Sequence, residues 1–135
     1  MKGILSDHDI AGQFRAVMSI LRSKTWREYW IHLSLAVHTL QDLGLPEHTE
    51  DSVIWHVCQK EQVVLITGNR NKDGPESLES TIEQFNAPHC LPVFTLADMR
   101  RVTKNRAYAK KVAEQLLEYL YDIDKLRGTG RLYLP

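Results

Sequence analysis

Short apolar runs alternate with amphipathic segments along this chain of 135 residues. The apolar runs predict four strands, at residues 3–5, 33–40, 62–67 and 91–96. Elsewhere, apolar residues recur every three or four positions, and this spacing predicts helices at residues 10–21, from 49 or 50 to about 60, 77–85 and 105–122. Strands alternating with helices predict an α/β fold. We expect a three-layer sandwich with a mostly parallel sheet of four or slightly more strands.

Two stretches fit this alternation less well. Residues 25–33, TWREYWIHL, are compatible with either a further helix or a connection packed on the core. Residues 127–135, RGTGRLYLP, are predicted to close the chain as a tail. The chain shows no repeat, low-complexity tract or linker, and its length is typical of one domain. We therefore expect a single domain over residues 1–135.

The composition excludes several classes of protein. Hydrophobic residues make up 43% of the chain and charged residues 25%, which is ordinary for a globular domain and unlike a disordered or collagenous sequence. Cys58 and Cys90 form no disulfide framework, which indicates a reducing compartment. The first residues turn acidic too soon for a secretory signal, and no apolar run approaches the ~18 residues that span a bilayer. We expect a cytoplasmic protein with no membrane partner.

Charge is unevenly distributed along a chain whose formal net charge is zero. Residues 1–41 carry a net +2, residues 42–98 carry −7 and residues 99–135 carry +5. The acidic middle is suited to gathering cations, and the basic end is suited to an anionic partner. Alternatively, the two blocks attract each other within the fold.

Hard oxygen ligands follow the predicted strands. Two acids come after the first strand, a polar loop follows the third, and another acid lies near the start of the preceding helix; these residues are Asp7, Asp9, Asp51, Asn69, Asn71 and Asp73. Sites in open α/β sheets form outside the carboxyl ends of the strands, so we expect Asp7, Asp51 and Asn69 to meet at one end of the sheet. Asp98, after the fourth strand, is expected at the same end.

Such a cluster of oxygens is suited to Mg²⁺ or Mn²⁺, which takes a few carboxylates and keeps several waters. The metal would orient a water and neutralise charge on a phosphodiester during hydrolysis. A second explanation is structural, because Asp and Asn are common at turns and helix starts. Asp9 and Asp51 are each equally well explained as helix caps.

Three segments of the chain resemble a small PIN-like domain: MKGILSDHDIAGQF, DLGLPEHTEDSVIWHV and QVVLITGNRN. In that family a strand ends in an Asp-Glu-Asn-like triplet, a Leu-Gly loop precedes an acid that opens a helix, and a later strand ends in Thr-Arg-Asp. The resemblance covers residues 1 to about 75. PIN-like domains are α/β folds, often metal-dependent ribonucleases, and frequently the toxins of bacterial toxin–antitoxin pairs.

The resemblance implies catalytic roles for three residues. Asp7 matches the first metal-binding acid of the family, Asp51 matches the second, and Asn69 falls at the Asp of the Thr-Arg-Asp motif, with Gly68 in place of its Arg. It also implies RNA as substrate, and an antitoxin or a second copy of the chain as a protein partner.

The asparagines depart from the family pattern. The amide oxygens of Asn69 and Asn71 bring no charge, so metal binding is expected to be weak. Two functions stay open: a metal-dependent ribonuclease with a weakened acidic site, and a catalytically inactive PIN-like interaction or regulatory protein.

A basic stretch follows the fourth predicted strand. Its positive residues are a candidate nucleic-acid surface leading to the acidic cluster, and they include Arg100, Arg101, Lys104 and Arg106. Alternatively, they form a solvated helix face or neutralise the acidic middle of the chain. Cys58 lies on an apolar helix face, which indicates a buried structural thiol rather than a zinc ligand or nucleophile.

Overall fold

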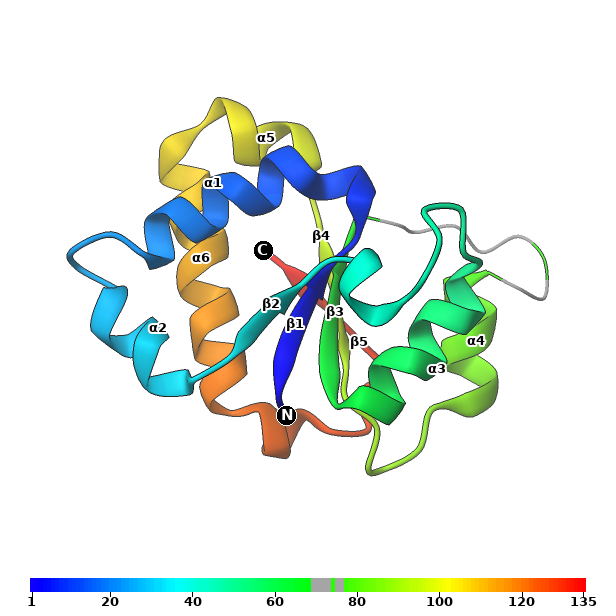
Figure 1. Cartoon of the computed structure of the whole chain (residues 1–135). Helices are drawn as coiled ribbons and strands as arrows, with labels where there is room; N and C mark the ends of the chain where they lie inside the picture. Colours follow the sequence, from blue (N-terminus) through cyan, green and yellow to red (C-terminus); the bar gives the residue numbers. More distant parts are fainter. Residues whose placement is uncertain (69–73, 75–76) are drawn as a thin grey trace.

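A five-stranded parallel sheet forms the centre of the molecule in the computed structural model, which describes residues 1–68, 74 and 77–135 (Figure 1). The strands lie in the order β2-β1-β3-β4-β5, and every neighbouring pair is parallel. Their bounds are β1 Gly3–Ser6, β2 Ala36–His38, β3 Val63–Thr67, β4 Val93–Leu96 and β5 Arg131–Leu134. The predicted α/β three-layer sandwich is thereby confirmed.

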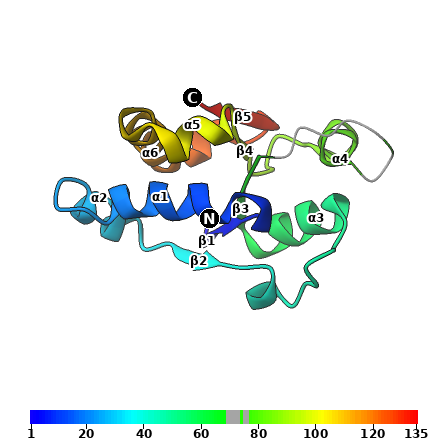
Figure 2. The same cartoon turned by 90° about the horizontal axis from the view of Figure 1, so that it is seen from above.

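Helices cover both faces of the sheet (Figure 2). One face carries α1 Ala11–Leu21, α2 Arg27–Leu33, α5 Met99–Lys104 and α6 Arg106–Tyr121, and the other carries α3 Asp51–Glu61 and α4 Leu78–Phe85. Short 3-10 turns complete the chain: η1 His8–Ile10, η2 Gln41–Leu43 and η3 Ile123–Leu126. Among the described residues, no helix is both long and apolar enough to cross a membrane.

The strand interiors divide the core into two parts. Alternate strand residues point to opposite faces, so Ile4, Val64 and Phe94 pack beneath α1 and α6, while Leu65 and Val93 pack beneath α3 and α4. Because β1, β3 and β4 are covered on both faces, nearly all of their residues are buried and most of them are apolar. This composition is why the sequence pattern identifies these strands.

The strand order changes direction beside β1. The chain leaves β1 for β2 on one side and then crosses to β3 on the other side. In a doubly wound sheet of this order the crossovers diverge at that point, which opens a crevice outside the carboxyl ends of β1 and β3. The first residues beyond those ends are Asp7 and Gly68.

Two sequence predictions need correction. Residues 127–135 are not a tail, because Arg131–Leu134 form β5, paired in parallel along β4. Gly128 and Gly130, with φ of 86° and 81°, turn the chain into this strand. The strand predicted at residues 33–40 is shorter, Ala36–His38, because α2 extends to Leu33. The ambiguous aromatic stretch is therefore mostly helical.

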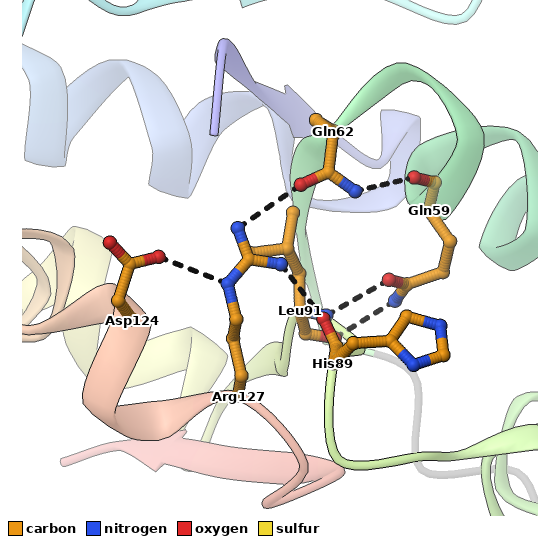
Figure 3. Close-up of polar contacts among 6 residues, drawn as sticks. All are labelled: Gln59, Gln62, His89, Leu91, Asp124 and Arg127. Atoms are coloured by element: carbon orange, nitrogen blue, oxygen red, sulfur yellow. Dashed lines mark hydrogen bonds and ion pairs between the residues drawn. The ribbon is translucent and has the colours of Figure 1, made fainter.

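Hydrogen bonds join the end of α3 to residues 89–91, which precede β4, at the amino-terminal end of the sheet (Figure 3). The Gln59 side chain pairs with the Leu91 backbone in both directions, donating to the Leu91 carbonyl at 2.9 Å and accepting from its N–H at 2.9 Å. The Gln62 amide donates to the Gln59 carbonyl at 2.8 Å. The last turn of α3 is thus fixed to a segment distant in sequence.

Arg127 completes this amino-terminal network. Its guanidinium donates to the Gln62 Oε1 at 3.1 Å, to the His89 carbonyl at 2.8 Å and to the Asp124 Oδ1 at 3.0 Å (Figure 3). A planar fork of donors suits three acceptors from three segments. One side chain therefore links η3, the segment that precedes β4 and the end of α3.

Candidate functional site

Asp7 is held where the carboxyl ends of β1 and β3 meet. Its backbone N–H donates to the Ile66 carbonyl at 3.0 Å, and its Oδ2 accepts a hydrogen bond from the Thr67 hydroxyl at 3.0 Å. The His8 Nδ1 lies 3.3 Å from the other carboxylate oxygen. The Asp7 side chain is only 12% exposed and Thr67 is fully buried. Neighbouring strands thus fix this carboxylate in position and orientation.

Asp9 and Asp51 bring further negative charge close to Asp7. Burial raises the pKa of the Asp9 carboxyl, and the charges of Asp7 and Asp51 raise it further, while His8 opposes the shift. Asp51 is half-buried in the first turn of α3. Acids from the turn after β1 and from the start of α3 therefore interact electrostatically at one end of the sheet.

Helix capping does not explain Asp9 or Asp51. Asp9 lies within η1, and the residue that caps α1 is Ile10. The residue before α3 is Glu50, whose side chain makes no capping hydrogen bond, and Asp51 is the first helical residue. An acid in a first helical turn is favoured by the helix dipole, but it is not a cap.

The donor set suits a cation that keeps much of its water. Within residues 1–68, 74 and 77–135, no group of three His, Cys, Asp or Glu side chains is placed to hold a metal ion. Mg²⁺ and Mn²⁺ are commonly bound through one or two carboxylates together with waters, and like charges in a partly buried place favour a counter-ion. Asn69, Asn71 and Asp73, the other predicted ligands, lie outside the described residues.

Asp98 lies beyond β4, as expected, but its carboxylate has a structural use. It is the N-cap of α5, accepting a hydrogen bond from the Arg101 N–H at 3.2 Å, and it is exposed. This is the usual role of an Asp at the start of a helix.

The predicted basic surface lies on α5 and at the start of α6. Arg100, Arg101, Lys104 and Arg106 are all exposed. The Arg101 guanidinium lies 4.6 Å from the centre of the Tyr108 ring, a cation–π contact. α5 packs against α1, where the Gln13 side chain donates to the Met99 carbonyl at 3.4 Å. The basic residues therefore begin at the same end of the sheet as Asp7.

Gly68, the first residue beyond β3, is closely packed. A Cβ placed at Gly68 would collide with the Met99 sulfur and would come within 3.1 Å of the Ile10 Cγ2. A larger side chain at this position would require the Met99 side chain to move away from the end of β3.

A buried polar row that the sequence does not reveal crosses the α3–α4 face of the sheet. Thr67 and Thr95 are register partners on β3 and β4, and both are fully buried. The Arg131 guanidinium, 8% exposed, donates to the Thr95 hydroxyl and pairs with the Glu79 carboxylate at 3.0 Å. The sequence does not indicate that Arg131 is buried, because only the pairing of β5 with β4 brings this residue inside the molecule.

A groove of about 730 Å³ adjoins the site on the side of β2. Its walls are α1 and the segment from β2 through η2 to Glu47, and Asp7 and His8 line one end. Ala11, Arg15 and Met18 are spaced so that they share one face of α1, and this spacing can be recognised in the sequence. The opposite wall follows only from the position of β2 in the sheet.

Cys58 has the environment of a structural thiol. It is 2% exposed in the core beneath α3, and burial raises its pKa to about 12, with the Asp7 charge adding to the shift. A thiol of such high pKa is neither nucleophilic nor an available metal ligand at neutral pH.

Comparisons with known proteins complete the description of the site. The chain matches no protein-family model, no curated protein and no solved structure. A functional proposal therefore has to be supported by the side chains at the carboxyl ends of β1 and β3.

Proposed function

We propose that this chain is a PIN-like ribonuclease that depends on Mg²⁺ or Mn²⁺, with Asp7 as its central carboxylate. One observation carries the proposal: the Asp7 carboxylate, 12% exposed and bonded to the Thr67 hydroxyl, lies at the point where the strand order reverses, with the charges of Asp9 and Asp51 nearby. Ligands of doubly wound sheets bind at such a point. The motif resemblance over residues 1 to about 75 supports the same site.

The chain's own residues would position the site. The Thr67 hydroxyl holds one oxygen of the Asp7 carboxylate by a hydrogen bond, and His8 lies beside the other oxygen. Asp7 would hold a divalent cation that keeps several of its waters, and Asp9 and Asp51 would add negative charge nearby. When bound, the cation supplies charge neutralisation and a water of lowered pKa. The overall reaction adds water across a P–O bond of RNA and releases a phosphate monoester and a hydroxyl group.

A second candidate, a PIN-like interaction or regulatory protein without catalysis, is favoured by a different observation. Both oxygens of Asp7 already have neighbours, Thr67 and His8, and the described residues hold no three-ligand metal group. A carboxylate satisfied by the protein has less to gain from a metal. The same fold would then bind RNA or a protein without hydrolysing it.

RNA cleavage with and without metal separates the two functions. We expect the wild type to cleave a fluorogenic single-stranded RNA in Mn²⁺ and to stop when EDTA is added. Asp7→Asn, which keeps an oxygen for the Thr67 hydroxyl, is expected to reduce the rate by roughly a hundredfold or more. Glu114→Gln, at an exposed position on α6, is the control and should leave the rate unchanged.

Two results would contradict the ribonuclease proposal. Absence of cleavage by the wild type in both Mn²⁺ and Mg²⁺ would favour the binding protein. Cleavage by Asp7→Asn at the wild-type rate would show that the activity does not come from this site.

A further inference from the structure

The groove beside the acidic site has the dimensions of a binding site. Its volume of about 730 Å³ lies within the usual range for ligand pockets, roughly 300–1,000 Å³. Its two walls, α1 and the chain through β2 and η2, can be followed in Figure 1. The helix that follows α1 in the chain, α2, packs against α6, where the Tyr121 hydroxyl donates to the Tyr29 carbonyl at 2.7 Å, and it does not line the groove.

The floor of the groove is apolar. Met18 and Leu40 are buried, and Phe14, Val37 and Leu45 are half-buried beside them. An aromatic ring among aliphatic side chains offers a surface on which flat heterocyclic groups pack with little dependence on their identity. The groove is thus suited to a ligand with repeated apolar faces.

Two arginines lie along the rim. Arg15 and Arg22 are exposed, line the groove from α1, and form no ion pair with another described residue. They lie seven positions apart, which corresponds to a rise of about 10 Å along the helix axis. The imidazole of His38 also lines the groove, and Glu47 is an acidic residue on the wall opposite α1. The rim is therefore suited to a ligand with spaced negative charges.

The groove is continuous with the acidic site. Asp7 and His8 line both, so a chain with one phosphate at Asp7 would extend along α1 past Arg15 and then Arg22. Alternating anionic and flat apolar groups are the chemistry of a nucleic acid. Bases already paired in a duplex cannot lie on an apolar floor, which favours a single strand.

We infer that this groove binds the single-stranded RNA that flanks the phosphodiester at Asp7, with bases over Phe14 and Val37 and phosphates at Arg15 and Arg22. The inference rests on the proposed function and assigns its substrate-binding surface to α1 and β2. An acidic peptide is the competing occupant. The apolar floor favours RNA, because the aspartate and glutamate side chains of such a peptide offer no flat apolar group to pack on Phe14.

Binding of a fluorescein-labelled oligouridylate without divalent metal tests this surface. Fluorescence anisotropy over a range of salt concentrations gives affinity and its salt slope without requiring cleavage. We expect Arg15→Ala/Arg22→Ala to weaken binding by roughly tenfold and to reduce the slope by about 1.4, which corresponds to two phosphates. Lys60→Ala/Lys125→Ala removes two exposed positive charges from the end of α3 and from η3, and should leave both quantities unchanged.

A second variant tests the groove without removing an arginine. Ser19 is exposed and lines the groove between Arg15 and Arg22, so Ser19→Glu introduces a negative charge with little effect on packing. We expect an affinity loss of similar size and an unchanged thermal midpoint. Oligouridylate affinity equal to wild type in both groove variants would overturn the inference, as would a wild type that binds acidic peptides but no oligouridylate.

The binding and cleavage experiments can fail separately. Groove-dependent RNA binding without Mn²⁺-dependent cleavage would support the groove assignment and contradict only the ribonuclease proposal. Metal-dependent cleavage with wild-type affinity in Arg15→Ala/Arg22→Ala would overturn the groove assignment and leave the proposed function standing.

Discussion

The two ends of the sheet treat polar side chains in opposite ways. At the amino-terminal end, Gln59, Gln62 and Arg127 pair with backbone and side-chain groups from three segments (Figure 3). At the carboxyl end, the negative charges of Asp7 and Asp51 lie close enough to Asp9 to repel its carboxylate. The first arrangement lowers the free energy of the fold, and the second raises it.

This difference separates a stabilising region from the proposed site. Polar groups that satisfy each other gain nothing from a ligand, whereas crowded carboxylates gain from any cation that binds the folded state. Changes at the two ends should therefore have opposite signs. Each of the following variants changes a polar side chain at one end of the sheet, and its effect on the stability of the fold is measured.

The largest effect is expected at the amino-terminal end. Arg127→Ala removes three hydrogen bonds and leaves the Gln62 and His89 oxygens without their donor. We expect a loss of about 2 kcal/mol in the free energy of unfolding, measured by urea denaturation. Lys125→Ala, at an exposed neighbouring position, is the control. A loss no larger than that of the control would remove the contrast between the two ends.

A smaller effect of opposite sign is expected at the carboxyl end. Asp7→Asn removes one of three like charges, and the metal-free protein should gain about 0.5 kcal/mol and a higher thermal midpoint. Added Mn²⁺ should raise the midpoint of the wild type, because it binds the folded state, and should not raise that of the variant. A destabilised variant, or an equal Mn²⁺ shift in both proteins, would be inconsistent with charge crowding at Asp7.

The smallest effect concerns pH. The pKa of Asp9 is raised in the fold above its ordinary value of 3.8, so the folded state holds this proton more tightly than the unfolded chain. Stability from this group is therefore present at acidic pH and falls as pH rises from 3.8 through the raised pKa. Asp9→Asn should flatten this part of the curve when the unfolding free energy is measured against pH. An identical curve in wild type and variant would contradict the raised pKa.

Several elements could be predicted because their cause is local. The β3 run of Val63–Thr67 is apolar on both faces, and the spacing of apolar residues in Arg106–Tyr121 is helical. Asp7 was identifiable as a site residue because an acid directly after a buried strand is expensive without a partner. Its partner, the Thr67 hydroxyl, lies 60 residues along the chain and was not identifiable.

β5 was missed because its evidence is not local. RLYL is short, follows two glycines and carries Arg131, whose charge argues against a buried strand. Its burial is possible only because Glu79 and Thr95, from α4 and β4, meet the guanidinium. A residue whose partners come from other elements cannot be judged from its own segment.

The sequence by itself determined the alternation of strands and helices, the three-layer class and the acids that end the first strand and begin α3, since these depend on spacing along one segment. Only the tertiary structure decided the strand order, which places β1 between β2 and β3. That order brings Asp7, Asp9 and Asp51 together and leaves the α1–β2 groove open beside them. The physical reason is that site geometry depends on which distant segments pack together, and hydrophobic periodicity records only which face of each segment is buried.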